Sequence, residues 1–549
     1  MTARQIEGEF RTVVDVLRAA AVTNADVEAY VEPETSTAPR QSMTFAQWDR
    51  AADGVAGLLA CHGVTRGSVV CLLLPSSIDY MVCYAAATRL GAVTSGVNLR
   101  LGAAEVRSIL ERTRPAVTVV DDRNAAPAGP TGAVLDRSAV STAKGGPAPE
   151  DRSELSPGDA VAVVWTSGTT GLPKGAVFDH ASLAAVAAGI DVLSEPGDRR
   201  LSPLPFAHVG SMTRTWDEIA HGVTTVITPT PWRAADAIRI MVDERITVAQ
   251  GVPTQWALVL DHPGLEGADL SSLRIAATGA SRVPSELVAA MRHRLGVPVV
   301  VRYTSTEASL GTGTVPGDPD EVVATTVGRP VPGVELAVAD ENGAELPPGE
   351  VGRVRLRSKA VMRGYWGGPR VGAGSPGVAY DLAATRSVLA EDGWLTTGDF
   401  GALDRSGCLR LVGRANELYI RGGYNVYPAE VEAALGGSPG IEQVAVVGAP
   451  DPVLGEVGVA FVVTVDRAPI DADELLAGLR AAARSSLADY KAPDRVVVVD
   501  SLPLTSMLKV DKRSLAARAA ALPPVRPGPG SSGGPTPDRR LPTNGARAS

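Results

Sequence analysis

The stretch Thr166–Gly175 combines residue types that suit the binding of phosphate groups. It reads Thr-Ser-Gly-Thr-Thr-Gly-Leu-Pro-Lys-Gly, with three glycines, four hydroxyl side chains and one lysine. Glycine lets the backbone approach a ligand, hydroxyls donate hydrogen bonds, and Lys174 supplies a compact positive charge. The apolar run Ala160–Trp165 predicts a buried strand before this loop, and Ala181–Ile190 predicts a helix after it. The order strand, loop, helix predicts a cradle for the phosphates of a nucleotide.

The spacing of this loop differs from that of the common NTPase loop. The pattern G-x-x-x-x-G-K-S/T requires Ser or Thr after the lysine, whereas Gly175 follows Lys174 here. A P-loop fold is therefore not implied. A polar surface turn is the alternative interpretation, and the density of glycines and hydroxyls directly after a buried strand argues against it.

Polar residues follow other predicted strands as well. The segments Thr278–Ser281 and Tyr303–Glu307 each come directly after an apolar run, and ligands of open α/β sheets bind at such carboxyl ends. His208 lies in a proline-rich turn, where a lone histidine is usually part of the core.

Lysine is rare in this chain. Of the 52 basic residues only six are lysines, which are Lys144, Lys174, Lys359, Lys491, Lys509 and Lys512. A retained lysine indicates a site that needs an ammonium group. For Lys144 and Lys359 we accept chance as the explanation.

Length and charge limit the class of protein. A chain of 549 residues predicts two or more domains, and 21% charged residues with 45% apolar residues is typical of a globular protein. The formal charge of −9 argues against nucleic acid or an anionic membrane as a partner. No apolar run is long enough for a membrane span, the N-terminus does not resemble a secretory signal, and the four cysteines lack metal-ligand spacing. We therefore expect a cytoplasmic protein that binds a small molecule, with no indication of its oligomeric state.

The hydrophobic pattern predicts a multi-domain α/β fold. Helix and strand patterns alternate from about residue 69, a small β subdomain is expected over 333–358, and 123–158 reads as a loose connection. A second α/β pattern begins near Arg414. The expected domains are 1–413, a large N-terminal domain of α/β layers with the small β subdomain, and 414–522, a small mobile C-terminal α+β domain. Residues 523–549 are expected to be a disordered tail.

Taken together, the motifs from about Phe45 to Leu515 resemble those of the adenylate-forming superfamily of acyl-CoA synthetases, nonribosomal-peptide adenylation domains and luciferases. Thr166–Gly175 resembles its phosphate loop, and Tyr303-Thr-Ser-Thr-Glu307 is similar to its Tyr-Gly-x-Thr-Glu motif. The resemblance implies ATP, Mg²⁺ and CoA as ligands. The implied nucleotide-binding residues are Thr166, Ser167, Gly168, Thr169, Thr170, Lys174, Gly279, Ala280, Ser281, Tyr303, Thr304, Ser305, Thr306, Asp399 and Arg414.

The resemblance also implies individual roles. Tyr303 would stack on adenine, Thr306 would contact a phosphate, and Asp399 with Arg414 would hold the ribose hydroxyls. Glu307 would bind Mg²⁺ and take part in catalysis. Lys509 would be the C-terminal catalytic lysine, which serves the carboxylate and the α-phosphate. His208 would lie beside the acyl site as a gate, with Asn416 as the hinge of the mobile domain. Gly422 and Gly423 would line the tunnel for the acceptor. Physical chemistry agrees, because cations stabilise the negative charge that develops on phosphate oxygens.

Three positions depart from the family pattern. Thr304 replaces the usual Gly, Asn416 stands where Asp or Lys is usual, and Leu508 replaces the Gly before the catalytic lysine. None of these removes a charged catalytic group. Residues 367–392 are also longer than the usual link, which indicates an inserted loop.

These motifs predict an ATP-dependent acid:CoA ligase that forms an acyl-adenylate of a small aryl, alicyclic or acyl acid and releases AMP and pyrophosphate. One alternative is an adenylate-forming enzyme with a carrier protein or an amine as acceptor, or with an unusual acid such as nitrite. Another is a silent nucleotide-binding protein. The acid pocket is expected from Val209–Trp216, Val252–Trp256 and Thr304–Gly313. Arg214 there would favour a second anionic group on the substrate if buried, or could equally face solvent.

Overall fold

The computed structural model describes residues 10–121, 132–149, 154–166, 173–279, 283–369, 377–465, 471–505 and 509–522. The chain forms two compact units. The first comprises Met1–Glu417 and Pro503–Asp511, and the second comprises Leu418–Leu502 and Lys512–Ser549.

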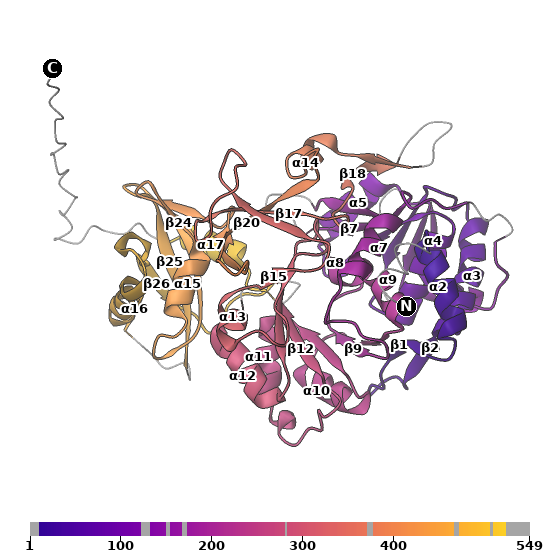
Figure 1. Ribbon diagram of the computed structural model, residues 1–549, viewed down its shortest axis with the longest axis horizontal. Coiled ribbons are helices and arrows are strands. Elements are labelled where there is room, and N and C mark those ends of the chain that lie inside the picture. Colours follow the sequence, from indigo (N-terminus) through magenta and orange to yellow (C-terminus); the bar gives the residue numbers. More distant parts are fainter. Residues whose placement is uncertain are drawn as a thin grey trace, which may run out of the picture. The chain divides into compact units, whose positions relative to one another are not determined.

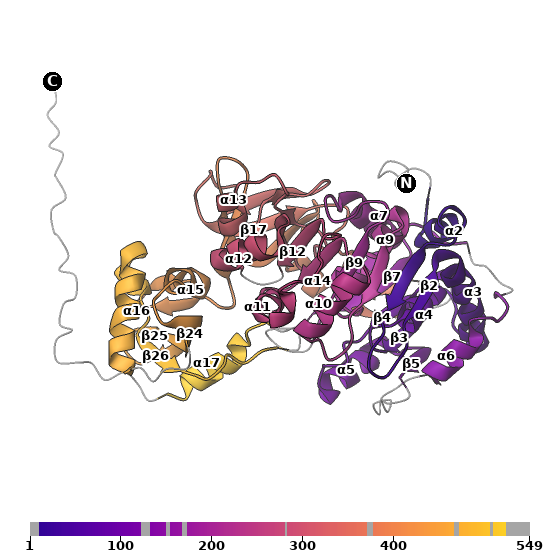
Figure 2. The ribbon, with the colours of Figure 1, turned by 90° about the horizontal axis from the view of Figure 1, so that it is seen from below.

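An eight-stranded sheet of the first unit carries the strand that precedes the phosphate loop (Figures 1 and 2). Its order is β19-β18-β8-β7-β4-β3-β5-β6, parallel from β7 to β6 and antiparallel from β7 to β19. The strands are β3 (Val69–Leu73), β4 (Val93–Gly96), β5 (Val117–Val120), β6 (Ala133–Asp136), β7 (Ala160–Trp165), β8 (Gly175–Asp179), β18 (Gly364–Pro369) and β19 (Val378–Tyr380). Strand β3 is buried throughout, as its continuous apolar run predicts for a parallel strand covered on both faces.

Helices of the first half of the chain pack beside this sheet. They are α2 (Val13–Thr23), α3 (Phe45–Cys61), α4 (Ile78–Arg89), α5 (Ala103–Thr113), α6 (Arg137–Ala143) and α7 (His180–Gly189). Helices α2 and α3 begin with capping boxes at Thr12 and Thr44. In each, the threonine hydroxyl accepts the backbone N–H three residues later, and the side chain of that later residue accepts the threonine N–H. Helices α3, α4 and α6 contact one another (Figure 2).

A nine-stranded sheet brings the second group of predicted motifs together. Its order is β15-β14-β13-β12-β11-β9-β10-β1-β2. The strands are β1 (Glu28–Glu32), β2 (Gln41–Thr44), β9 (Arg199–Ser202), β10 (Thr224–Ile227), β11 (Val248–Gly251), β12 (Ile275–Gly279), β13 (Val299–Tyr303), β14 (Thr312–Gly313) and β15 (Arg329–Pro330). The helices are α8 (Val209–Met212), α9 (Thr215–His221), α10 (Ala234–Asp243), α11 (Pro253–Asp261), α12 (Ser285–Leu295) and α13 (Asp320–Thr325), with a 3₁₀ turn at Pro263–Leu265. Because β12 and β13 are parallel and adjacent, Gly279 and Tyr303 end at the same edge.

The predicted small β subdomain is a four-stranded antiparallel sheet of order β16-β17-β20-β21. Its strands are β16 (Glu335–Ala339), β17 (Gly352–Arg357), β20 (Trp394–Leu403) and β21 (Leu409–Arg414). The short helix α14 (Leu382–Arg386) precedes β20.

The second unit has the α+β pattern that the sequence predicts. Strands β23-β22-β25-β24 form a sheet in that order, with β26 paired to β25. The elements are β22 (Tyr419–Arg421), β23 (Tyr424–Val426), α15 (Pro428–Leu435), β24 (Ile441–Asp451), β25 (Gly455–Thr464), α16 (Ala472–Ser486), a 3₁₀ turn at Asp489–Lys491, β26 (Arg495–Val498) and α17 (Lys512–Ala520). The predicted domain limits at 413/414 and 522/523 stay predictions, and 523–549 lies outside the described residues.

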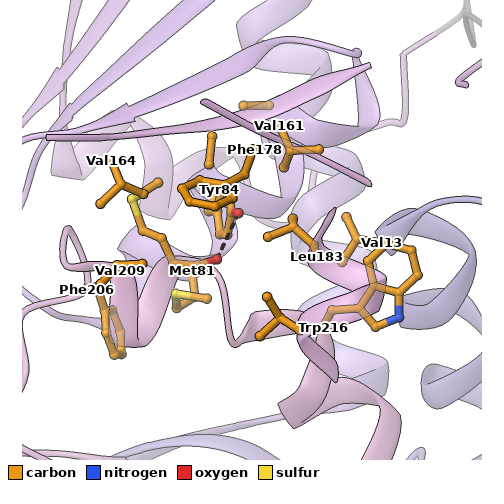
Figure 3. Packing of buried hydrophobic residues seen from close by; sticks show 14 of the residues in the cluster. Val13, Met81, Tyr84, Val161, Val164, Phe178, Leu183, Phe206, Val209 and Trp216 are labelled. Carbon is orange, nitrogen blue, oxygen red and sulfur yellow. Dashed lines mark hydrogen bonds between the residues drawn. The ribbon is translucent and has the colours of Figure 1, made fainter. Parts of the chain in front are cut away.

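The largest core of the first unit joins the first sheet to the helices that follow it in sequence. Trp216 of α9 is fully buried, and Figure 3 shows it among apolar side chains that include Val13 and Leu183. Tyr84 of α4 donates its hydroxyl to the backbone oxygen of Met212 at 3.0 Å. This bond satisfies a buried phenol and ties α4 to the end of α8.

Three sequence interpretations are corrected here. The phosphate loop is followed by strand β8, which returns antiparallel to β7 before α7 begins, so the order is strand, loop, strand, helix. Within 123–158, β6 and α6 are ordered elements rather than a loose connection. Within residues 367–392, where the sequence indicates an inserted loop, the described chain forms the end of β18 as far as Pro369, then β19 and α14, and residues 370–376 lie outside the described ones. In the described parts of the chain, no helix is both long and apolar enough to cross a membrane.

A buried ionic cluster fixes α9 to β9. Asp217 is fully buried, and its Oδ2 lies 3.3 Å from Arg200 Nη2 and 2.9 Å from Arg214 Nη2. Arg200 Nη1 lies 3.1 Å from Glu218 Oε1. Although burial raises it, the two arginines and His221 hold the pKa of Asp217 well below its ordinary value. The carboxylate is therefore ionised and compensates buried positive charge.

We expect Asp217→Ala to destabilise the protein by about 3–5 kcal/mol, because it leaves two buried guanidinium groups without this carboxylate. The matched control is Asp243→Ala, which removes an exposed pair with Arg239 on α10 at 3.3 Å and is expected to cost no more than about 0.5 kcal/mol. Urea and thermal unfolding measure both variants. Equal losses of stability in the two variants would contradict the interpretation.

Candidate nucleotide and acid-activation site

Asp399 joins Tyr303 and Arg414 in the first unit. The Tyr303 hydroxyl donates to Asp399 Oδ2 at 2.7 Å, and Arg414 Nε donates to Oδ1 at 3.0 Å. Asp399 and Arg414 are cross-strand partners of β20 and β21, so the antiparallel register places them face to face. Tyr303 and Asp399 are 6% and 7% exposed, whereas the Arg414 side chain is half exposed. Although burial disfavours its charged form, the Asp399 carboxylate holds the pKa of Arg414 above its ordinary value.

The described ends of the phosphate loop are fastened to each other. The Thr166 N–H donates to the Lys174 carbonyl at 2.8 Å, and the Lys174 N–H donates to Thr166 Oγ1 at 3.3 Å. Arg112 of α5 donates to the Pro173 carbonyl at 2.7 Å, and its guanidinium lies 4.7 Å from the ring centre of Trp165. Ser167, Gly168, Thr169 and Thr170 lie outside the described residues.

Lys174 and Glu307 both contact Tyr365, the lysine at the face of the ring and the glutamate at the hydroxyl. The Tyr365 hydroxyl donates to Glu307 Oε1 at 2.7 Å, and Lys174 Nζ lies 5.1 Å from the centre of the Tyr365 ring. Burial and the Glu307 carboxylate raise the pKa of Tyr365 well above its ordinary value. The phenol therefore keeps its proton and acts as a donor to the carboxylate.

After β13, Thr304 and Ser305 lead into a tight turn at Thr306–Ala308. Thr304 Oγ1 donates to the Ser305 carbonyl at 3.2 Å, and Ser305 Oγ accepts the Ala308 N–H at 3.2 Å. Ser309 has a φ of +58°, an uncommon conformation for a residue other than glycine. The Met362 N–H donates to the Glu307 carbonyl at 2.8 Å and anchors that residue to the segment before β18. Gly279 ends β12, and Ala280 and Ser281 lie outside the described residues.

His208 caps α8 and is neutral near pH 7. Its Nδ1 accepts the Gly210 N–H at 3.1 Å, which leaves the ring proton on Nε2. Burial and the positive charge of Lys509 lower the pKa of His208 to about 4. The role of His208 as a gate beside the acyl site stays a prediction.

Lys509 lies in the first unit, at the end of a short hairpin. The Thr505 N–H donates to its carbonyl at 2.7 Å, and Leu504 bridges to Val510. Burial and the Arg414 guanidinium lower the pKa of Lys509 to about 8, against the opposing effect of Asp399. Lys509 thus lies within electrostatic range of Asp399, Arg414 and His208, residues that are distant in sequence. Leu508 lies outside the described residues.

Arg214 is neither in solvent nor available to a substrate. Its side chain is 9% exposed, and Asp217 neutralises it at 2.9 Å. Of the two interpretations of Arg214 left open by the sequence, the solvent-facing one is wrong. The buried position gives no support for a second anionic group on the acid, because the arginine already has its counter-ion.

A cavity of about 100 Å³ opens at the carboxyl ends of strands in both large sheets. Val252 and Gln255 come from one segment that was expected to form the acid pocket, whereas Val209–Trp216 and Thr304–Gly313 do not line this cavity. The full lining is Leu74, Pro75, Ser76, Val97, Asn98, Leu99, Arg100, Pro203, Leu204, Pro205, Phe206, Ala207, Thr228, Pro229, Thr230, Trp232, Val252 and Gln255. The predicted acid pocket therefore stays a prediction.

Gly422 and Gly423 form the two-residue turn between β22 and β23 of the second unit. Their φ values are +57° and +87°, the pattern of a type I′ hairpin, which glycine adopts without strain. Turn geometry alone accounts for both glycines, and their role in an acceptor tunnel stays a prediction. Asn416 lies in the turn after β21, at the end of the first unit, and its hinge role likewise stays a prediction.

Sequence reasoning missed Tyr365 and Arg112. Tyr365 belongs to the Gly-Tyr-Trp segment just before residues 367–392, and Arg112 is one arginine among many. The Gly364-Tyr365 pair was the only local signal for Tyr365. Nothing in the local sequence distinguishes Arg112, because its partners Trp165 and Pro173 lie more than 50 residues away.

The residues present fit a Mg²⁺ ion that is bound jointly by the protein and by the phosphates of the nucleotide. Within the described residues, no cluster of His, Cys, Asp or Glu could by itself hold a metal ion. Mg²⁺ usually keeps several waters and takes one or two carboxylates together with substrate phosphates. Glu307, with Lys174 next to it across Tyr365, suits that mode of binding.

Comparisons with known proteins agree with this geometry. The family described as AMP-binding enzyme matches residues 17–366, and the AMP-binding enzyme C-terminal domain matches residues 430–509. The chain is 35% identical over 508 residues to an indoleacetate–CoA ligase of Aromatoleum aromaticum, which covers 87% of this chain and 94% of that enzyme.

Two solved structures are also similar. An anthranilate CoA ligase in complex with anthranoyl-AMP has 25% identity and a TM-score of 0.82, covering 95% of this chain and 99% of that one. An amide bond synthetase of Marinactinospora thermotolerans has 27% identity and a TM-score of 0.77, covering 92% and 99%. With matches over nearly its whole described length, the chain belongs to the family of AMP-binding enzymes.

Proposed function

We propose that this protein is an acid:CoA ligase that activates a small organic acid with ATP as an acyl-adenylate and then transfers the acyl group to CoA. The observation that carries the proposal is the Asp399 carboxylate held by Tyr303 and Arg414, within whose electrostatic influence the Lys509 ammonium lies. An ammonium group there suits the negative charge that develops when a carboxylate attacks the α-phosphate of ATP.

Each group in the site has a part in this chemistry. Asp399 accepts hydrogen bonds from the ribose hydroxyls, with Arg414 and Tyr303 holding its two oxygens in place. Lys174 serves the β- and γ-phosphates, and Glu307 holds Mg²⁺, which neutralises phosphate charge when bound. His208 stays neutral beside the acid. The metal, the hinge at Asn416, the tunnel at Gly422 and Gly423, and the cytoplasmic location remain predictions.

The acid is proposed to carry one carboxylate on an aryl, alicyclic or aliphatic body. Arg214 is neutralised inside the protein, which removes the strongest candidate for a second anion contact. The names of similar enzymes agree with acids that have an aromatic body, since they include an indoleacetate–CoA ligase and a feruloyl-CoA synthase.

The direct test incubates the purified protein with ATP, MgCl₂, CoA and a panel of acids. Aryl-acetic, cinnamic, medium-chain and dicarboxylic acids of matched size form the panel, and mass spectrometry detects AMP and CoA thioesters. We expect thioesters of monocarboxylic acids and much less product from dicarboxylic acids. Pyrophosphate exchange without any thioester would rule out CoA as the acceptor.

Amide formation is the second candidate function, favoured by the similarity to an amide bond synthetase over 92% of this chain. It shares the adenylation step and differs in the acceptor. Replacing CoA by a panel of primary amines in the same assay separates the two, because an amide product appears only if the amine attacks the adenylate.

We expect adenylation to lose activity as pH rises through about 8, the pKa to which burial and Arg414 lower that of Lys509. Below that pH the ammonium is charged and stabilises the transition state, and above it the amine is neutral. Lys509→Arg keeps a positive charge, so its basic limb of kcat/KM in pyrophosphate exchange should move to higher pH despite a lower rate. Lys491→Arg, at a lysine paired with Glu430, is the control. A basic limb that stays in place in Lys509→Arg would contradict the assignment.

Asp399→Asn should weaken ATP binding roughly 10- to 100-fold, the cost of losing hydrogen bonds to a charged group. The KM for the acid should change little, because Asp399 is proposed to contact only the ribose. Isothermal titration with ATP measures the effect. Asp340→Asn is the control, since Asp340 accepts backbone N–H groups in an exposed turn and an amide oxygen can replace it. Equal ATP affinity in the two variants would refute the role of Asp399.

A further inference from the structure

Tyr365 connects two groups that belong to different parts of the proposed phosphate site. Its hydroxyl donates to Glu307 Oε1 at 2.7 Å, while Lys174 Nζ lies 5.1 Å from the ring centre. Lys174 lies near the end of the phosphate loop, directly before β8, and Glu307 follows β13 in the other large sheet. One side chain therefore contacts both the carboxylate and the ammonium of the site.

The backbone holds Tyr365 in a fixed place. Its N–H donates to Thr385 Oγ1 at 2.9 Å, and its carbonyl accepts the Asp381 N–H at 2.8 Å. Gly364 before it has a φ of +152°, and a Cβ there would lie 2.9 Å from Tyr380 Cδ1. Only glycine fits that position without strain, which explains the Gly-Tyr pair. Tyr365 is 5% exposed, so its ring has little freedom to turn.

The hydrogen bond sets how the Glu307 carboxylate can be used. A carboxylate has two oxygens with about four lone-pair sites, and the phenol takes one on Oε1. The carboxylate plane is then fixed, with acceptor sites left for a cation. The ring face meanwhile attracts the Lys174 ammonium, an interaction worth about 0.5–2 kcal/mol.

We propose that Tyr365 is a positioning residue that aligns Glu307 for the metal ion and Lys174 for the nucleotide phosphates. It acts through these two residues and does not contact the reacting atoms. The inference rests on the proposed function for the roles of Glu307 and Lys174. Its two contacts are separable, because the hydroxyl serves the carboxylate and the ring serves the lysine.

The first experiment removes the hydroxyl alone. Mn²⁺ binding in the presence of α,β-methylene-ATP is titrated by electron paramagnetic resonance, which needs no turnover. Tyr365→Phe should weaken Mn²⁺ binding roughly 10-fold, the effect of one hydrogen bond to a charged group. The matched control is Tyr30→Phe, which removes a buried phenol that donates to Glu218 Oε2 at 3.2 Å. That variant should lose stability and keep the Mn²⁺ affinity of the parent.

The second experiment removes the ring. Metal-free binding of α,β-methylene-ATP, measured with EDTA present, should be unchanged in Tyr365→Phe and roughly 2- to 30-fold weaker in Tyr365→Leu. Circular dichroism and thermal unfolding check that the leucine variant is folded. If it is not folded, the Mn²⁺ titration of Tyr365→Phe alone decides the proposal.

Unchanged Mn²⁺ affinity in Tyr365→Phe, or an equal loss in Tyr30→Phe, would overturn the proposal. These results are distinct from failure of the proposed function. A parent protein that binds Mn²⁺ with the nucleotide analogue and makes no acyl-CoA would refute the ligase activity, while the binding comparison would still test Tyr365.

Discussion

The Asp399 carboxylate is the interaction on which the rest of the site depends. One oxygen receives the hydroxyl of Tyr303 from the nine-stranded sheet, and the other receives Arg414 from the neighbouring strand of the small β subdomain. Its negative charge also opposes the lowering of the pKa of Lys509. A single buried carboxylate thus links three segments of the chain.

Around this carboxylate, the positive charges of Arg414 and Lys509 exceed the negative charge of Asp399. Lys509 lies near both Arg414 and Asp399, and the repulsion from Arg414 together with burial is stronger than the attraction to Asp399, so the pKa of Lys509 falls. Burial and the same ammonium together lower the pKa of His208 and keep its ring neutral. An anionic nucleotide and an anionic acid are the natural complement of such a site, since they supply the negative charge that the protein lacks there.

The phosphate loop is built differently from the P-loop. It joins two antiparallel strands, and its described ends are tied together by Thr166, Lys174 and the Arg112 side chain. Lys174 therefore directly precedes strand β8, next to the ring of Tyr365, rather than the N-terminus of a helix. This arrangement fixes the lysine even though it is exposed.

Much of the fold and site could be predicted from the sequence. Continuous apolar runs such as Val69–Leu73 marked buried strands, because a parallel strand covered on both faces needs apolar residues throughout. The residue types of the phosphate loop with Lys174 indicated phosphate binding, because hydroxyl, backbone and ammonium donors suit phosphate oxygens, whereas the roles of Tyr303, Glu307, Asp399 and Lys509 came from the family resemblance and stay predictions. Strand β8 and the elements β6 and α6 were not predicted, since their short segments become ordered only by pairing with β7 and β5 or packing against α3 and α4.

The sequence by itself determined which residue types could bind a nucleotide and where the long elements begin and end. Only the tertiary structure decided their partners. It paired Arg214 with Asp217 and brought Lys509 within the electrostatic influence of Asp399. It also placed Tyr365 in contact with both Lys174 and Glu307. The physical reason is that periodicity and composition act over a few neighbouring residues, whereas the pairing of charges depends on contacts between segments up to hundreds of residues apart.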